Sequence, residues 1–216
     1  MSEISFLKIA IRAKALCFGD YKLKSGRISP YFFDASLLYN GKNWNQLSHC
    51  YAEKIIQQKI QFEILFGPAY KGIPLVSAIS AVLFNKYDYE VDFCYNRKER
   101  KEHGERGILV GRDFAHKKVL IVDDVITAGT AISQTIELVQ AHGAVIVGAI
   151  VALDRQEIAS QSKLSAIQLI EEKYGVPFFS ISTLEKLITF VQNKDNFHPK
   201  LLQSIRNYRA LNGTGV

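Results

Sequence analysis

One junction between a strand and a helix constrains the fold of this chain more than any other feature. Val119–Val122 is a continuous apolar run rich in β-branched residues, as expected for a strand buried on both faces of a parallel sheet. Asp123 and Asp124 follow the run directly. A short loop of threonine and glycine then leads into Gly129–His142, where apolar residues recur at helical spacing. The sequence therefore predicts a central strand that ends in two carboxylates, with a helix beginning just beyond them.

The chemistry of this junction suits a phosphorylated sugar. Ligands of open α/β sheets bind beyond the carboxyl ends of strands, and a helix N-terminus offers N–H groups and a partial positive charge to a phosphate. Thr127 and Thr130 add hydroxyl groups, Gly129 permits close approach of the backbone, and the carboxylates can accept hydrogen bonds from sugar hydroxyls. The alternative is a plain turn in which Asp or Thr caps the helix. The loop is not a P-loop, because no Gly-Lys-Ser/Thr follows.

Strands and helices alternate from about residue 61 onward, which predicts an α/β fold with a central, mainly parallel sheet flanked by helices. Besides the junction, we expect strands at residues 62–66, 91–95, 145–153 and 178–181. We expect further helices at residues 73–84, 165–174, 183–191 and 198–211. Residues 61–216 are therefore predicted to form the α/β core, with residues 212–216 frayed.

The first part of the chain follows a different pattern. Helical spacing is found at residues 6–16 and 43–57, and the stretch at residues 21–39 is rich in aromatic and turn residues. A chain of 216 residues suits one large domain with a small appendage. We therefore expect residues 1–60 to form a hood packed on the core, within a single structural unit.

A basic segment, Asn96–Arg112, interrupts the α/β pattern. It mixes basic residues with glutamates and glycines, and it has almost no apolar residue before Ile108. Such a segment cannot bury itself, so we predict a mobile loop between strands. The alternative is a solvated hairpin tip or a surface helix.

The formal net charge of +6 fits a small polyanionic substrate, a nucleic acid or simply a basic surface. The basic residues gather in one segment among acids instead of forming a stripe that tracks a phosphate backbone. No helix-turn-helix extension is visible. We therefore expect no nucleic-acid partner.

The three cysteines, Cys17, Cys50 and Cys94, lie far apart and lack the spacing of metal ligands, which favours reduced thiols in a reducing compartment. The first residues do not form a signal peptide. The apolar stretches are well below the ~20 residues of a membrane span. We therefore expect a cytoplasmic protein without a membrane partner.

Four further segments accompany the junction. They are Lys22–Asp34, Phe66–Pro74, Asn96–Glu105 and Leu153–Glu157. The strand, acid pair and Thr-Ala-Gly-Thr loop resemble the phosphoribosyl-diphosphate signature of type I phosphoribosyltransferases. With all five segments in order and spacing, nearly the whole chain resembles the orotate phosphoribosyltransferases of the bacterial type.

The resemblance implies a type I phosphoribosyltransferase fold with an N-terminal hood. It also implies transfer of the phosphoribosyl group from 5-phosphoribosyl 1-diphosphate to orotate. The products would be orotidine 5'-phosphate and diphosphate, in the de novo synthesis of pyrimidines (UMP).

The resemblance further implies roles for individual residues. Catalytic roles would belong to Lys71, Lys101, Asp123 and Asp124. Phosphoribosyl diphosphate would contact Lys24, Tyr70, Lys71, Arg97, Lys98, Lys101, His103, Asp123, Asp124, Val125, Ile126, Thr127, Ala128, Gly129, Thr130 and Ala131. Orotate would contact Phe32, Phe33, Thr127 and Arg155. The residue types fit, because the planar fork of arginine can bond both carboxylate oxygens and an aromatic pair suits a planar ring.

Magnesium is the implied cofactor. It would be held mainly by substrate oxygens and water near Asp123 and Asp124, with no direct protein ligand, which fits its preference for hard oxygens and retained water. In the implied homodimer, residues 97–107 would close over the diphosphate and reach the neighbouring subunit's site.

Two other functions share part of this pattern. A phosphoribosyltransferase for a purine or for uracil would keep residues 123–130, but it should lack the paired phenylalanines and the arginine suited to a carboxylate. A regulator that keeps the fold to bind nucleic acid is less favoured, because the basic charge is so localised.

Overall fold

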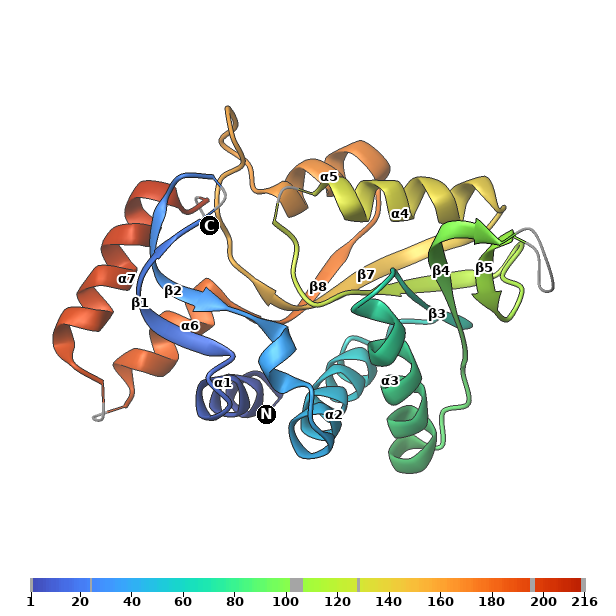
Figure 1. The fold of residues 1–216 in the computed structure, drawn as a ribbon, viewed down its shortest axis with the longest axis horizontal. Coiled ribbons are helices and arrows are strands. Elements are labelled where there is room, and N and C mark those ends of the chain that lie inside the picture. Colours follow the sequence, from blue (N-terminus) through green and yellow to red (C-terminus); the bar gives the residue numbers. More distant parts are fainter. Residues whose placement is uncertain (1, 24, 102–106, 128, 195–196, 215–216) are drawn as a thin grey trace.

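The computed structural model describes residues 2–23, 25–101, 107–127, 129–194 and 197–214, with the backbone alone for residues 2, 100, 101 and 107. Its centre is a six-stranded sheet (Figure 1). In their order across the sheet, the strands are β5 Gly107–Gly111, β4 Asp92–Lys101, β3 Ile64–Gly67, β6 Lys118–Val122, β7 Val145–Asp154 and β8 Phe178–Thr183. Neighbours from β4 to β8 run parallel, and β5 pairs antiparallel with β4. The predicted α/β class is therefore confirmed.

Helices cover both faces of the sheet (Figure 1). On one side lie α4 Thr130–Ala141 and α5 Ala166–Tyr174, and on the other lie α2 Gly41–Gln57 and α3 Gly72–Tyr87. Successive side chains of a strand point to opposite faces. In β6, Val119 and Ile121 therefore pack in one core with Ile136 of α4, whereas Leu120 and Val122 join the other core. This double burial explains why β6 has no polar residue between Lys118 and its end.

The N-terminal and C-terminal elements pack together beside the sheet (Figure 1). They are α1 Ser2–Arg12, β1 Leu16–Lys22, β2 Ile28–Phe33, the 3-10 helix η1 Ala35–Leu38, α6 Leu184–Gln192 and α7 Pro199–Asn212. Strands β1 and β2 form a separate antiparallel pair, β2 contacts α7, and α1 contacts β8 and α6. The helix predicted at residues 6–16 ends earlier, since Lys14 has a positive φ of 57° and Leu16 already belongs to β1.

The prediction of a loop at Asn96–Arg112 is wrong for the described residues 96–101 and 107–111, which form strands. Residues 96–101 continue β4 and residues 107–111 form β5, with Asn96 opposite Leu109 and Lys101 opposite Gly107. Backbone pairing at the edge of a sheet does not require buried side chains, and charged residues are common on edge strands. The described parts of the basic segment are therefore two antiparallel strands, and residues 102–106 lie outside the described ones.

The prediction that residues 212–216 are frayed is also wrong for residues 212–214. The Thr214 N–H donates to the Gln156 carbonyl and the Ile158 N–H to the Asn212 carbonyl, both at 2.9 Å. Glu157 and Gly213 form an antiparallel bridge. The chain after α7 is thus tied to the residues that follow β7. Residues 215 and 216 lie outside the described range.

None of the helices within the described ranges combines the length and the apolar composition needed to cross a bilayer.

Candidate active site

The carboxyl ends of β3, β4, β6 and β7 meet at one edge of the sheet, because these strands are parallel. The acid pair follows β6 at this edge. Asp124 is buried, with 6% of the residue exposed, and its carboxylate accepts a hydrogen bond from Lys71 Nζ at 2.6 Å. Lys71 stands just before α3, so a residue far away in the sequence supplies the cation for a buried carboxylate.

The backbone of the acid pair is held on two sides. The Asp123 N–H donates to the Ile150 carbonyl, and the Ala152 N–H donates to the Asp124 carbonyl, so the chain beyond β6 still runs beside β7. The hydroxyl of Tyr51, a fully buried residue of α2, donates to the Asp123 carbonyl at 2.7 Å. This anchoring gives the two carboxylates fixed positions.

The electrostatics of the pair follow from its burial. Burial and the neighbouring Asp124 raise the pKa of Asp123 well above its ordinary value, although Lys71 lowers it. Burial lowers the pKa of Lys71, but the hydrogen bond and charge of Asp124 outweigh burial, so the net shift is upward. The pKa shifts of both groups are therefore upward: Lys71 keeps its charge more firmly, and Asp123 holds its proton more tightly than a solvated aspartate does.

The loop of residues 125–131 leads from the acid pair into α4. Gly129 precedes the helix with a φ of +84°, in the left-handed region that glycine adopts without strain. A Cβ atom on Gly129 would lie 2.9 Å from Ile170 Cδ1, so any side chain here would also require Ile170 to shift. Among the described residues, no side chain caps the start of α4. The first N–H groups of α4 thus suit a phosphate.

The residues that follow β3 lie at the same edge of the sheet as the acid pair. A Cβ atom on Gly67 would lie 2.3 Å from the Gly72 carbonyl oxygen, so this turn requires the two glycines to approach closely. Between them, Tyr70 is 66% exposed and lies 4.7 Å, from ring centroid to Nζ, from Lys98 of β4. Asn96 accepts the Ala69 N–H at 3.0 Å and joins β4 to this turn. Tyr70, Lys71 and the start of the basic segment are therefore brought together.

The two phenylalanines predicted for the base do not lie on one side. They are adjacent in β2, so their side chains point in opposite directions. Phe33 is buried against Phe6, with ring centroids 5.7 Å apart, whereas Phe32 is 42% exposed and stacks on Tyr21. In this arrangement Phe32 can face a ligand and Phe33 supports the strand from the core.

Arg155 directly follows β7, the strand beside β6. Val125 pairs with Leu153, which places the phosphate loop next to the end of β7. Arg155 is paired with Glu157, at 2.5 Å between Nη2 and Oε1. The predicted base-binding arginine and the predicted sugar-phosphate loop therefore occupy neighbouring positions at the same edge.

The structure describes some of the predicted site residues only in part or not at all. Lys24, His103 and Ala128 lie outside the described residues, and for Lys101 the backbone alone is described. Arg97 lies in β4, and Val125, Ile126, Thr127, Thr130 and Ala131 flank Gly129. Sequence reasoning assigned no role to Tyr51, Asn96, Glu157 or Tyr208, all of which contact site residues. Asn96 and Glu157 lie within the matched segments, whereas Tyr51 and Tyr208 carry no motif.

A parallel sheet whose central strand ends in an acid pair, followed by a helix whose start no described side chain caps, is typical of the type I phosphoribosyltransferase class. The family model of the phosphoribosyl transferase domain matches residues 35–183. An orotate phosphoribosyltransferase of Salmonella agona is 45% identical over 204 residues, which are 94% of each chain. The crystal structure of an orotate phosphoribosyltransferase from Francisella tularensis superposes with a TM-score of 0.88 at 39% identity, covering 97% of this chain and 99% of that one. The chain belongs to the orotate phosphoribosyltransferases, a family of phosphoribosyl-transferring enzymes.

The fold extends to a more distant protein. A UMP synthase of Leishmania donovani matches with a TM-score of 0.75 at 22% identity, covering 96% of this chain and 42% of that one. At this identity the match concerns the fold alone.

Proposed function

We propose that this protein transfers the phosphoribosyl group from 5-phosphoribosyl 1-diphosphate to orotate, releasing diphosphate and forming orotidine 5'-phosphate for pyrimidine synthesis. The observation that carries the proposal is the placement of Arg155 at the end of β7, beside the acid pair and phosphate loop that follow β6. A purine or uracil carries no carboxylate for such an arginine, so this placement favours an acidic base.

The proposed roles follow from where each group of residues lies at this edge of the sheet. Asp123 and Asp124 accept hydrogen bonds from the ribose hydroxyls, while residues 125–131 surround the 5-phosphate. Tyr70, Lys71 and Lys98 face the diphosphate, together with Lys24, Arg97, Lys101 and His103. Phe32 and Thr127 meet the base, and Arg155 pairs with its carboxylate. Residues 1–60 serve as the hood over the core formed by residues 61–216.

Catalysis of this reaction depends on positioning the reactants and on stabilising the charges that develop as the bonds change. A ring nitrogen of the base forms a bond to the anomeric carbon as the bond from that carbon to diphosphate breaks. Positive charge develops on the sugar and negative charge on the leaving group. Asp123 and Asp124 lie on the sugar side, and the basic segment lies on the diphosphate side. Closure of the basic segment over the diphosphate would exclude water from the reactive sugar.

Magnesium fits this site as an ion that enters with the substrate. Within the described residues, no three His, Cys, Asp or Glu side chains gather as metal ligands, and Asp124 is already engaged by Lys71. Bound to diphosphate oxygens, Mg²⁺ would supply positive charge to the leaving group.

The test is a direct assay. The protein is mixed with orotate, phosphoribosyl diphosphate and Mg²⁺, and the loss of orotate absorbance is followed. Adenine, guanine, hypoxanthine and uracil are offered in parallel. We expect turnover with orotate and none with the others. Turnover with a purine or uracil alone would overturn the proposal.

We further propose that the protein is a cytoplasmic homodimer in which residues 97–107 of one subunit reach the other's site. The free thiols of Cys17, Cys50 and Cys94 fit a reducing compartment. Lys101→Ala and Asp124→Asn variants, each weak alone, should regain activity when mixed and allowed to exchange subunits. A mixed dimer then has one site with both groups intact. A mixture no more active than its components would contradict the shared site.

A further inference from the structure

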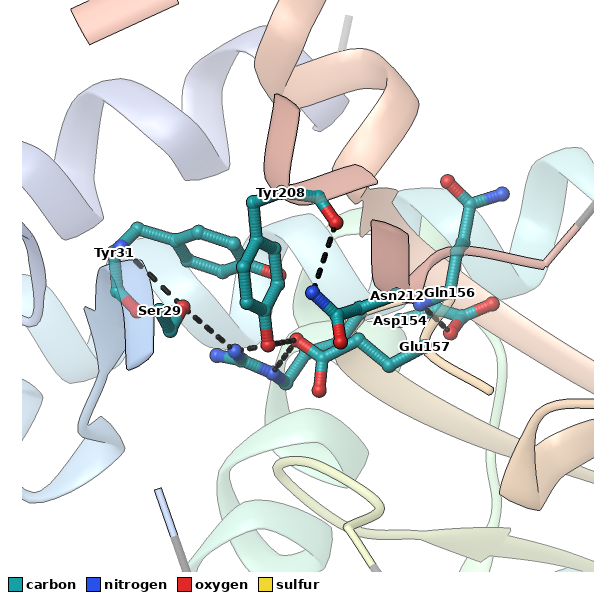
Figure 2. Close-up of polar contacts among 8 residues, drawn as sticks. Ser29, Tyr31, Asp154, Gln156, Glu157, Tyr208 and Asn212 are labelled. Carbon is teal, nitrogen blue, oxygen red and sulfur yellow. Dashed lines mark hydrogen bonds and ion pairs between the residues drawn. The ribbon is translucent and has the colours of Figure 1, made fainter. Parts of the chain in front are cut away.

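The guanidinium of Arg155 contacts Ser29, Tyr31 and Glu157, the positions of which are shown in Figure 2. Its Nε and Nη2 donate to Glu157 Oε1 at 2.9 and 2.5 Å, and Nη2 also donates to Ser29 Oγ at 3.1 Å. Its Cζ lies 4.3 Å from the centroid of the Tyr31 ring, within the range of a cation–π contact. The Arg155 side chain is 11% exposed, so these contacts decide where it points.

Glu157 is itself fixed by the C-terminal helix. The hydroxyl of Tyr208, a buried residue of α7, donates to Glu157 Oε1 at 3.0 Å. The Tyr208 ring also packs edge-on against Tyr31, with centroids 6.3 Å apart. The backbone of Glu157 pairs with Gly213. Glu157 thus has side-chain and backbone anchors in the same C-terminal segment. Ser29, Tyr31, Glu157 and Tyr208 are called the Arg155 cage below.

The cage leaves one part of the guanidinium available. Arginine has N–H groups on Nε, Nη1 and Nη2. The hydrogen bonds that Arg155 donates to Glu157 and Ser29 use Nε and Nη2, and none of them uses Nη1. Glu157 therefore occupies the edge of the fork away from Nη1. A carboxylate on Glu157 and a carboxylate on a ligand can engage the same arginine at different positions.

We propose that Glu157, anchored by Tyr208, is a positioning residue that aims Arg155 at the carboxylate of the base, which makes α7 part of the base-recognition apparatus. The inference rests on the proposed role of Arg155 in binding orotate. An unanchored arginine must lose side-chain entropy on binding, whereas a caged one has already lost it. The opposing account is that Glu157 competes with the ligand for Arg155. The two accounts predict opposite changes in the KM for orotate.

Steady-state kinetics of four variants test the proposal, with KM measured separately for orotate and for phosphoribosyl diphosphate. Glu157→Ala should raise the KM for orotate about tenfold, since it removes a charge-assisted hydrogen bond to the arginine. Its KM for phosphoribosyl diphosphate should stay within about twofold of the wild-type value. Glu157→Gln keeps an acceptor oxygen for Arg155 and Tyr208 and should recover most of the lost affinity. Tyr208→Phe should raise the orotate KM about threefold.

Asn207→Ala is the matched control, because Asn207 lies on the exposed side of the same helix and bonds only to Gln203 in the described part of the chain. It should leave both constants unchanged. A lower orotate KM in Glu157→Ala would establish competition and overturn the proposal. An equal rise in both constants would indicate a general structural role and overturn it as well. If Glu157→Ala fails to fold, Tyr208→Phe decides between the same outcomes.

Two further measurements separate this inference from the proposed function. Absence of orotate turnover in the wild type would refute the proposed function itself. An unchanged orotate KM in Arg155→Ala would remove Arg155 from the base site. A raised orotate KM in Arg155→Ala, with none in Glu157→Ala or Tyr208→Phe, would overturn the positioning role alone.

Discussion

Replacing Lys71 with methionine removes the cation of the acid pair with little change in side-chain length. The lost bond joins Lys71 Nζ to Asp124 Oδ2 at 2.6 Å, with the Asp124 side chain only 8% exposed. A hydrogen bond to a charged group contributes about 1.5–3 kcal/mol. Because the lysine side chain is 45% exposed, solvent screening places the expected loss near the lower end, about 1.5 kcal/mol. For a chain of this size, that corresponds to a fall in Tm of about 3–6 °C.

The loss should depend on pH. Lys71 lowers the pKa of Asp123, so the variant raises that pKa further. A carboxyl with a raised pKa favours folding at low pH and loses that contribution as the pH rises through its folded-state pKa. Thermal denaturation of the ligand-free protein should therefore show a Tm difference between Lys71→Met and wild type that is larger near pH 8 than near pH 5.

Lys117→Met is the matched control for this experiment. Lys117 bonds to Glu63 at 2.7 Å, a similar distance, but both side chains are about half exposed, at 50% and 45%. The control should leave Tm almost unchanged at either pH, since an exposed pair contributes little. Equal Tm shifts in the two variants, or a Lys71→Met shift that shrinks as the pH rises, would refute the reasoning.

Three other outcomes are expected. Asp123→Asn should raise the Tm of the ligand-free protein near pH 8 but not near pH 5, because the raised pKa makes the ionised wild-type carboxyl increasingly unfavourable as the pH rises. Turnover of this variant should fall. A lower Tm near pH 8 would contradict the reasoning. Lys101→Ala should lower kcat far more than Tm, as measured by initial rates and thermal denaturation, and unchanged turnover would remove its role. A chelator should abolish turnover without changing the Tm of the ligand-free protein, whereas a Tm shift would indicate an ion held by the protein itself.

The features that the sequence predicted well are local ones. The β6 strand and the start of α4 follow from apolar periodicity and from the acid pair, and their neighbours in the sheet follow from the alternation of strands and helices. A parallel sheet then places the ends of β3, β6 and β7 together without further information.

The features that it missed depend on distant contacts. Tyr51 and Tyr208 reach the site from α2 and α7, and nothing in their local sequence marks them. The family resemblance assigned both Phe32 and Phe33 to the base, although adjacent residues of a strand face opposite sides. The basic segment was expected to be a loop because it cannot bury itself, yet edge pairing organises its backbone.

The Arg155 cage also has a consequence for biosynthesis of the protein on the ribosome. Its members come from residue 29 at one side of the sequence and residue 208 at the other, while the acid pair, Lys71 and Tyr51 all precede residue 125. A domain generally folds as a unit, so each half of the site needs the last element that contributes to it. The sugar-phosphate half needs the chain at least to Ala152, because Ile150 and Ala152 hold the acid pair, whereas the base half also needs Tyr208. In ribosome-stalled chains of increasing length, the segment around residue 155 should become resistant to protease only after residue 208 has left the exit tunnel, and earlier protection would argue against this dependence.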